Sequence, residues 1–175
     1  FTIEAKLGLN PWDVFHDGFS KLINVRIGFA GVITGFIVLL GWIPLKQKPF
    51  LGTILNILTI GNVLDLTMYF IPTPESIIMR HGYLYFGTVL FAMGVGIYIG
   101  SGLGPGPRDG IMTGIAKKGP SVRVTRIAID FTAFVSGVLL GGSYGYGTIF
   151  MVIIVGPIVQ FSLKRYDKGA IFSLK

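Results

Sequence analysis

The chain has no cysteine and only two histidines, His16 and His81. Without thiols it cannot form disulfide bonds, iron–sulfur clusters or a thiol nucleophile, and neither histidine has metal-ligand spacing. There is no Gly-rich, lysine-containing phosphate loop. The Gly-x-Ser-x-Gly match at Gly141–Gly145 lies in a short link between apolar runs, not in the strand-to-helix turn that this motif needs. We therefore expect no enzyme activity, no metal and no cofactor.

Charged residues are also scarce. They make up 13% of the sequence, whereas 51% is hydrophobic and the mean hydropathy is +0.71. A soluble domain carries about 25% charged residues, so we expect lipid to cover much of the surface. Five apolar runs of about 16–21 residues approach the roughly 20 that cross a bilayer as a helix: Val25–Ile43, Leu51–Ile71, Tyr83–Ile99, Val124–Leu140 and Thr148–Leu163. The sequence predicts an all-α polytopic membrane protein.

The net charge of +7 is unevenly distributed. All Lys and Arg residues except Lys6, Lys21, Arg26 and Arg80 fall in alternate loops, at one end of the predicted helices. Loops rich in Lys and Arg face the cytoplasm in membrane proteins. We interpret the excess as this topology signal and expect no nucleic-acid partner. The prediction is a multi-pass protein of the cell (cytoplasmic) membrane with its C-terminus in the cytoplasm.

Two segments about 96 residues apart share an unusual pattern. Gly8–Asp13 reads Gly-Leu-Asn-Pro-Trp-Asp, and Gly104–Asp109 reads Gly-Pro-Gly-Pro-Arg-Asp. Each is a Gly/Pro-broken loop that bears an aspartate and lies between apolar runs. Further glycine-containing pairs recur at almost the same spacing: Gly18 and Gly114, Gly52–Ile54 and Gly147–Ile149, Gly61 and Gly156. Repeats of this kind are typical of secondary transporters.

The repeat predicts two three-helix units, residues 1–72 and 73–175, which together form one membrane domain. It aligns Phe1 with Ile97, near the end of a predicted helix, so we expect a further helix before Phe1 and six in the natural protein, five of them present. Three crossings are an odd number, so the second unit is expected to be inverted relative to the first.

Each broken loop is followed by a predicted short helix, Asp13–Leu22 and Asp109–Lys118, with the aspartates as N-caps. On one interpretation these are half-helices that enter the membrane from opposite faces and hold an anionic or zwitterionic solute at their N-termini. The alternative is a surface-lying amphipathic helix with no ligand. On the first interpretation the substrate-binding candidates are Asn10, Trp12, Asp13, Gly106, Arg108 and Asp109. Trp12, Trp42, Tyr69 and Tyr166 also fall near predicted interfaces, where aromatic rings anchor.

Ionisable residues inside apolar runs are candidates for function, because burying a charge in lipid costs about 2.5–3.5 kcal/mol on insertion scales. Asp65 shares a helix face with Asn62, and its repeat partner is Gln160. Asp130 lies four residues after Arg126, which predicts an ion pair along one helix. For both aspartates the alternatives are coupling-ion or substrate binding and a helix-packing hydrogen bond.

Pro11-Trp12-Asp13, Gly104–Gly110 and Ser121-Val122-Arg123 resemble the YczE/YitT-type integral membrane proteins of bacteria, a likeness that spans Phe1 to about Tyr166. The resemblance implies a small six-helix membrane protein of poorly defined role, with some members associated with small-molecule export and others with regulation of secondary metabolism. It supplies no catalytic residues. The first helix and the ligand-sensing domain that follows the last helix in longer YitT-like proteins do not occur in this sequence.

Two functional hypotheses follow. The first is a small secondary transporter of a small organic solute, with its site at the interface of the repeats. Arg108 would contact an anionic group, and Asp65 would supply coupling. The second is a non-transporting accessory, scaffold or regulatory subunit of a larger membrane complex. In either case the expected partners are the lipid bilayer and a homo-oligomer or larger assembly, and the first adds a small-molecule solute.

Overall fold

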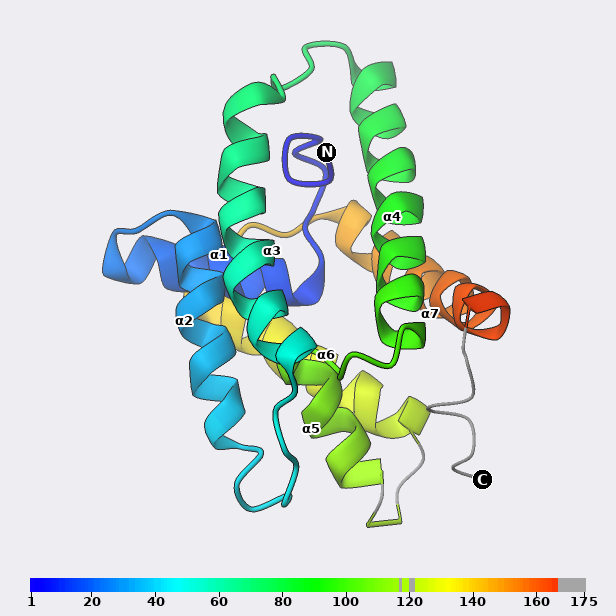
Figure 1. The fold of residues 1–175 in the computed structure, drawn as a ribbon. Helices are drawn as coiled ribbons and strands as arrows, with labels where there is room; N and C mark the ends of the chain where they lie inside the picture. The colour runs from blue at the N-terminus through cyan, green and yellow to red at the C-terminus, as the bar shows by residue number, and fades with distance from the viewer. Residues whose placement is uncertain (117, 120–121, 167–175) are drawn as a thin grey trace. The chain divides into compact units, whose positions relative to one another are not determined.

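The computed structural model describes residues 1–116, 118–119 and 122–166. In these ranges every regular element is an α-helix (Figure 1). The helices are α1 Pro11–Ile23, α2 Ile27–Leu40, α3 Leu51–Phe70, α4 Ile77–Gly100, α5 Pro107–Ala116, α6 Val122–Leu139 and α7 Tyr146–Tyr166. The all-α prediction is confirmed, and each of the five apolar runs overlaps one helix along most of its length.

The two short helices are present but start earlier than predicted. They begin at Pro11 and Pro107, so Asp13 and Asp109 lie in the first turn and not at the N-cap. The N-cap prediction was therefore wrong. Proline is favoured at the first helical position because its fixed φ suits the helix and its missing N–H leaves no donor unpaired. Both aspartates still lie at the positive end of their helix dipole, which stabilises a carboxylate.

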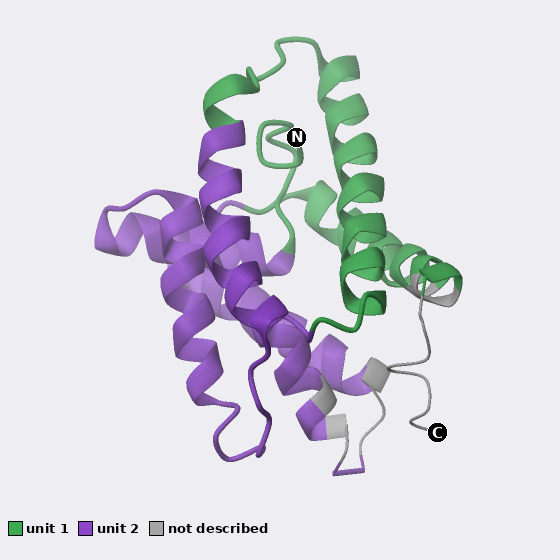
Figure 2. Cartoon of the chain, viewed as in Figure 1, with its two compact units in different colours: residues 1–10, 68–103, 144–175 green, residues 11–67, 104–143 purple. Residues whose placement is uncertain are grey.

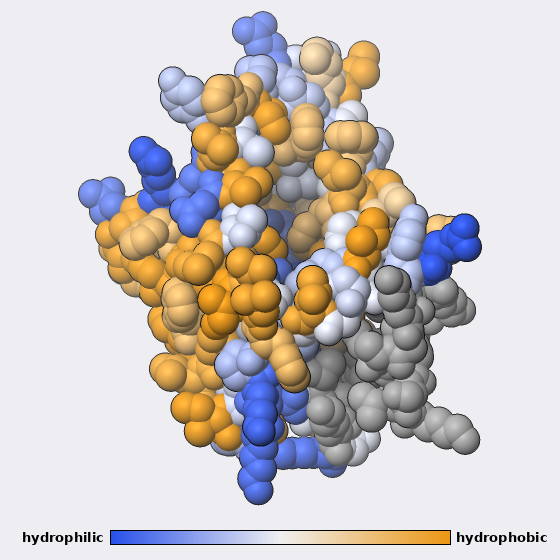
Figure 3. Space-filling view, viewed as in Figure 1, coloured by the Kyte–Doolittle hydropathy of each residue, from blue (hydrophilic) through white to orange (hydrophobic). Residues whose placement is uncertain are grey.

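Among the described residues, two helices are long and apolar enough to cross a membrane, α3 and α4. A third span is obtained if α1 and α2, which meet at a bend of 104°, are counted as one broken span. The helix α6 carries Arg123, Arg126 and Asp130, and only Tyr146–Val159 of α7 is continuously apolar. The count of five spans stays a prediction. Large apolar side chains are exposed along the helices (Figure 3), and such surface is typical of contact with lipid or a partner.

The chain divides into two compact units, each built from segments of both halves of the sequence (Figure 2). Unit 1 comprises residues 1–10, 68–103 and 144–175. In it α4 packs along α7, with Leu84, Ala92, Met151 and Val155 in a core that also includes Ala5. The Ser162 hydroxyl donates to the Met93 carbonyl at 3.1 Å, which adds a polar link between the two helices.

Unit 2 comprises residues 11–67 and 104–143, and so holds α1, α2, α5, α6 and most of α3. Here α1 packs against α6 and α2, and α5 packs against the same two helices. Glycine makes the closest approach in α6: a Cβ at Gly137 would lie 2.5 Å from the backbone nitrogen of Phe15. The absence of a side chain at this position therefore allows α1 to lie directly on α6.

Trp42 is buried in unit 2, with 2% of its surface exposed. Its indole N–H donates to the Pro107 carbonyl at 2.7 Å, and its ring lies against Gly110, where an added Cβ would be 1.9 Å from Cζ2. The prediction that Trp42 is an interfacial anchor was wrong. A buried indole is stable here because α5 supplies both an acceptor for its N–H and a residue with no side chain.

Each broken loop contacts the start of a long helix from the other half of the sequence. In unit 1, Gly8 has a φ of +129° and lies against Thr148, while Leu7 accepts a 2.8 Å hydrogen bond from Gly147. In unit 2, Gly104 has a φ of +109° and lies against Thr53, whose hydroxyl donates to the Pro105 carbonyl at 2.9 Å. The two loops thus make the same kind of contact with a Gly-Thr-Ile segment.

Candidate functional site

Five polar side chains of unit 2 gather at the N-terminal ends of α1 and α5 and on α6. We call this group the charged cluster: Trp12, Arg108, Asp109, Arg126 and Asp130. The indole Nε1 of Trp12 donates to Asp130 Oδ1 at 3.0 Å. The Arg126 and Asp130 side chains approach to 3.7 Å, which confirms the predicted ion pair, and Arg108 approaches Asp109 at 3.8 Å. Four of these five residues were predicted site residues.

The local sequence explains this convergence. Pro11 and Pro107 set the starts of α1 and α5, so Trp12, Arg108 and Asp109 all lie in a first helical turn. Arg126 and Asp130 lie one turn apart on α6, which contacts both short helices. The cluster is mostly shielded: Asp109 is 7% exposed. Two guanidinium and two carboxylate groups balance in charge, and this allows them to share a partly buried place.

The space enclosed by the charged side chains is small. Arg108, Asp109, Arg126 and Asp130 surround a hollow of about 10 Å³ that is closed by Met112 and Ile129. A water molecule needs about this much room. The charged cluster can therefore hydrate or bind a single small group, but it does not contain the room for a whole organic solute.

A larger space, here called the apolar groove, adjoins the charged cluster in unit 2. It has a volume of about 420 Å³. Its walls come from α1, α2, α5 and α6: Trp12, Phe15, Phe19, Thr34, Ile37, Val38, Ile111, Ala128, Ile129, Thr132, Ala133 and Ser136. Trp12 and Ile129 belong to both places, because Trp12 bonds to Asp130 and Ile129 also lines the hollow. The sequence did not predict this groove, because its small residues on α6 resemble ordinary packing positions.

The remaining predicted residues lie elsewhere. Asn10 and Gly106 are buried at the starts of α1 and α5, and the Gly106 carbonyl accepts the Gly110 N–H at 2.9 Å. Asp13 lies 3.8 Å from His16 on the same helix. Neither Asn10, Gly106 nor Asp13 lines the hollow or the apolar groove, so their assignment as substrate contacts stays a prediction.

The polar pair on α3, Asn62 and Asp65, also lies outside these two spaces. The Asp65 carboxylate accepts the Gly28 N–H at 2.9 Å, and the Asn62 amide donates to the Leu58 carbonyl at 2.6 Å. Gly28 is the second residue of α2, so Asp65 satisfies a backbone donor that the helix itself leaves unpaired. This contact gives the packing alternative a defined partner. The side chain of Gln160, the third predicted member, lies outside the described residues.

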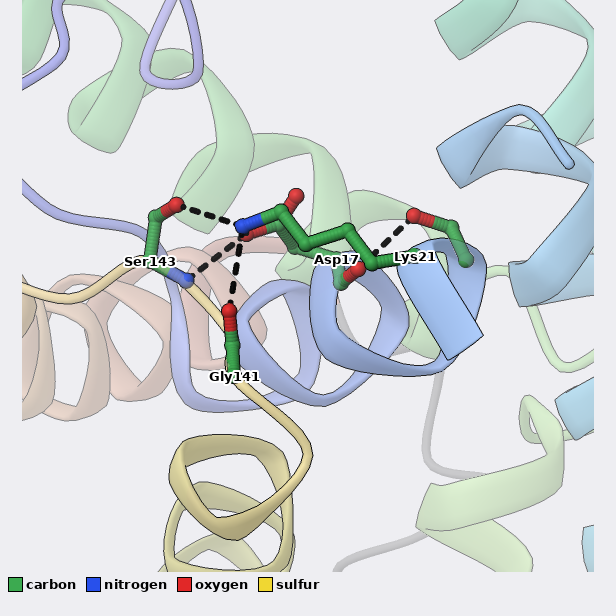
Figure 4. Close-up of polar contacts among 5 residues, drawn as sticks. Asp17, Lys21, Gly141 and Ser143 are labelled. Atoms are coloured by element: carbon green, nitrogen blue, oxygen red, sulfur yellow. Dashed lines mark hydrogen bonds and ion pairs between the residues drawn. The ribbon is translucent and has the colours of Figure 1, made fainter. Parts of the chain in front are cut away.

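Ser143, the serine of the Gly-x-Ser-x-Gly match, takes part in a polar contact between α1 and the link after α6 (Figure 4). The Asp17 carboxylate accepts from the Ser143 backbone N–H at 2.7 Å and from Lys21 Nζ at 2.8 Å. Lys21 also donates to the Ser143 hydroxyl at 3.0 Å and to the Gly141 carbonyl at 3.1 Å. The Ser143 hydroxyl thus accepts a hydrogen bond from an ammonium group. The contact is a clasp that holds the second half of α1.

Comparison with known proteins identifies the family. Residues 1–164 match the profile described as "Family of unknown function (DUF6198)". The chain belongs to the DUF6198 family. The Bacillus subtilis "Uncharacterized membrane protein YczE" is 34% identical to this DUF6198 chain over 168 residues, 94% of the chain and 78% of the relative. This confirms the resemblance inferred from the broken loops.

Two further relatives are similar over most of this DUF6198 chain. An "Uncharacterized protein" of Haemophilus influenzae is 35% identical over 158 residues, 90% of this chain and 72% of that protein. The "Uncharacterized protein YyaS" of Bacillus subtilis is 24% identical over 166 residues, 91% and 82% of the two chains. No solved structure matches. The membrane-protein relative and the apolar helices together indicate that this DUF6198 protein is located in a membrane.

Proposed function

We propose that this protein is a small secondary transporter of a small organic solute in the cytoplasmic membrane, working without a metal, a cofactor or a catalysed reaction. One observation carries the proposal. Trp12 of α1, the adjacent Arg108 and Asp109 of α5, and Asp130 of α6 come from three helices and gather at one place in a lipid-facing helical protein. Charged groups in such surroundings generally face a solute or water pathway.

The contacts of the two broken loops support an inverted repeat. Gly8 meets Thr148, and Gly104 meets Thr53, so each loop contacts the Gly-Thr-Ile segment of the other half. The glycines that follow behave alike: a Cβ at Gly18 would meet Leu140 and Gly142, and one at Gly114 would meet Leu45 and Gln47. Exchanged contacts at a constant spacing are expected of two halves related by a pseudo-two-fold axis.

In this proposal the charged cluster binds the polar group of the solute. Arg108 and Arg126 offer guanidinium donors to an anionic group, and Asp130 is held in place by the Trp12 indole. Asp65 remains the candidate for coupling to a proton or cation. Replacing it with asparagine should abolish proton-linked flux while the protein stays folded, and undiminished flux in that variant would remove Asp65 from the coupling step.

The first experiment is a thermal-shift screen of the detergent-purified full chain against metabolites and antibiotics, followed by uptake of each stabilising compound in proteoliposomes. A ligand at a hundredfold excess over its Kd raises stability by about 2.7 kcal/mol. We expect a hit that Arg126→Gln weakens and that Arg80→Gln, on a helix of unit 1, leaves unchanged. A blank screen together with a stoichiometric co-purifying protein would contradict the transporter and favour an accessory subunit of a larger complex.

A further inference from the structure

We infer that the solute is a single-chain anionic amphiphile, with its apolar chain in the apolar groove and its anionic group at Arg126. The inference rests on the proposed function for the site, but it makes a binding claim that can be tested without any transport step. It follows from the volume of the groove, the direction of its hydroxyl groups and the geometry of the adjoining ion pair.

Volume decides where the body of the solute lies. The hollow of the charged cluster has about 10 Å³, whereas the apolar groove has about 420 Å³. Pockets that bind small molecules span about 300–1,000 Å³. The groove is in this range and the hollow is not, so a bound solute must place most of its atoms against the groove.

The chemistry of the groove walls decides what that body is made of. Aromatic and aliphatic side chains form most of the lining, led by Phe15, Phe19 and Ile37. Two hydroxyl groups of the lining are turned back to their own helices: Thr34 donates to Ala30 and Thr132 donates to Ala128, each at 2.8 Å. A sugar or amino acid in this space would leave polar groups without partners, at about 1–3 kcal/mol each. A hydrocarbon chain loses nothing there.

The end of the groove at Trp12 and Ile129 decides the charge of the head group. Here Asp130 already accepts the 3.0 Å hydrogen bond from Trp12. Arg126 lies 3.7 Å from Asp130, which is longer than the 2.7–3.2 Å of an N–H···O hydrogen bond. Its guanidinium can therefore donate to a second carboxylate, and a charge-assisted hydrogen bond of this kind is about twice as strong as a neutral one. An amine would instead compete with the Trp12 indole.

The two tryptophans of the chain provide a direct test. Trp12 lines the groove, whereas Trp42 is buried and 2% exposed. We would measure quenching of tryptophan fluorescence by 11-bromoundecanoate in the full chain, purified in a lipid nanodisc. The expected result is saturable quenching that unbrominated dodecanoate reverses and that dodecylamine and dodecanol do not. Trp12→Phe should remove the saturable part and leave the Trp42 signal.

Variants at two positions locate the ligand. Arg126→Gln should weaken bromoundecanoate binding about tenfold, while Arg126→Lys, which keeps the charge, should recover part of the affinity. Thr132→Leu, which adds bulk in the groove, should also weaken binding. A circular-dichroism melt of each variant identifies any that fails to fold, and the dodecanoate competition in the unaltered protein decides the question without them. Quenching that rises linearly with added ligand, or equal competition by dodecylamine, would overturn the inference.

The binding test and the transport test can fail independently of each other. Saturable dodecanoate binding without movement of dodecanoate across proteoliposomes would retain the site and remove the transport step. Transport of a polar solute with no dodecanoate binding would retain the transporter and remove the amphiphile.

Discussion

The indole N–H of Trp12 donates a 3.0 Å hydrogen bond to the carboxylate of Asp130, 118 positions further along the chain. This contact joins the first turn of α1 to the middle of α6 and fixes Asp130 beside Arg126. Trp12 was predicted from its place in a broken loop, and Asp130 from its charge in an apolar run. The hydrogen bond shows that the two residues belong to one site.

The first prediction concerns the coupling of this pair. Trp12→Phe keeps an aromatic ring but removes the donor, and Asp130→Ala removes the acceptor. Each should lower the free energy of unfolding by about 1–3 kcal/mol, and in a double-mutant cycle the two changes should couple by at least about 0.5 kcal/mol. Chemical denaturation in detergent measures all four proteins. Strictly additive effects would mean that the hydrogen bond contributes nothing in the folded protein.

A second prediction concerns Gly110 on α5. An added Cβ would lie 1.9 Å from Cζ2 of the buried Trp42 ring, so Gly110→Ala should destabilise the protein by about 1–3 kcal/mol or more. Gly94, on α4, has nothing within 4 Å of an added Cβ. Gly94→Ala should therefore be neutral or stabilising, by about 0.5–1 kcal/mol. Thermal unfolding compares the two, and Trp42→Phe combined with Gly110→Ala should recover part of the loss.

A third prediction tests the contacts of the broken loops. Gly8→Ala and Gly104→Ala should each destabilise, because both residues have a positive φ and their added Cβ would lie 2.6 Å and 2.7 Å from Thr148 and Phe50 atoms. Gly141 also has a positive φ, +81°, but open space around it. Gly141→Ala should show the backbone strain alone, about 1 kcal/mol. Equal losses in all three unfolding curves would mean that the loop contacts add nothing to the strain.

A fourth prediction separates the two interpretations of Asp65. Asp65→Asn keeps an oxygen that can accept the Gly28 N–H, so stability should change little. Asp65→Leu leaves that donor unpaired and should lower the free energy of unfolding by about 1–3 kcal/mol. Hydrogen exchange at the Gly28 amide is the sharper readout, because only the leucine variant should speed it. Equal exchange in both variants would show that the carboxylate does not hold this helix end.

The fifth prediction concerns the clasp of Figure 4. Asp17 accepts from both Lys21 and the Ser143 backbone, whereas Lys21 is half-exposed and its loss leaves the Ser143 N–H bonded to Asp17. Asp17→Ala should therefore destabilise more than Lys21→Ala, whose effect should stay below about 1 kcal/mol. Raising the salt concentration should reduce the effect of Lys21→Ala. A larger loss from Lys21→Ala would contradict this division of roles.

Much of the helical pattern could be predicted from the sequence. Apolar runs such as Leu51–Ile71 predicted α3 nearly to the residue, because few other structures accommodate a run of that length and composition. The short helices were predicted in place but two residues late, since the aspartates were read as caps and proline at the first position was not weighed. The ion pair of Arg126 and Asp130 also followed from spacing, because it is local to one helix.

What could not be predicted depends on contacts between distant segments. Nothing in the sequence around Trp42 distinguishes a buried indole from an interfacial one, and its burial follows from Pro107 and Gly110, more than sixty residues away. The apolar groove is likewise formed by four helices whose faces are each unremarkable alone. To predict whether such a residue is buried or exposed, one must know which helix faces meet. The periodicity within one helix does not give this information.

In the proposed repeat, Trp42 and Gly137 correspond at a spacing of 95 residues, one the largest residue type and the other the smallest. Trp42 fills the space over Gly110, while Gly137 lies on the backbone of Val14 and Phe15. A chain made by duplicating the first half would drive an indole into that backbone. A chain made by duplicating the second would leave a void over Gly110 and the Pro107 carbonyl without its donor. In the proposed repeat the two halves would therefore be complementary and not interchangeable at this position.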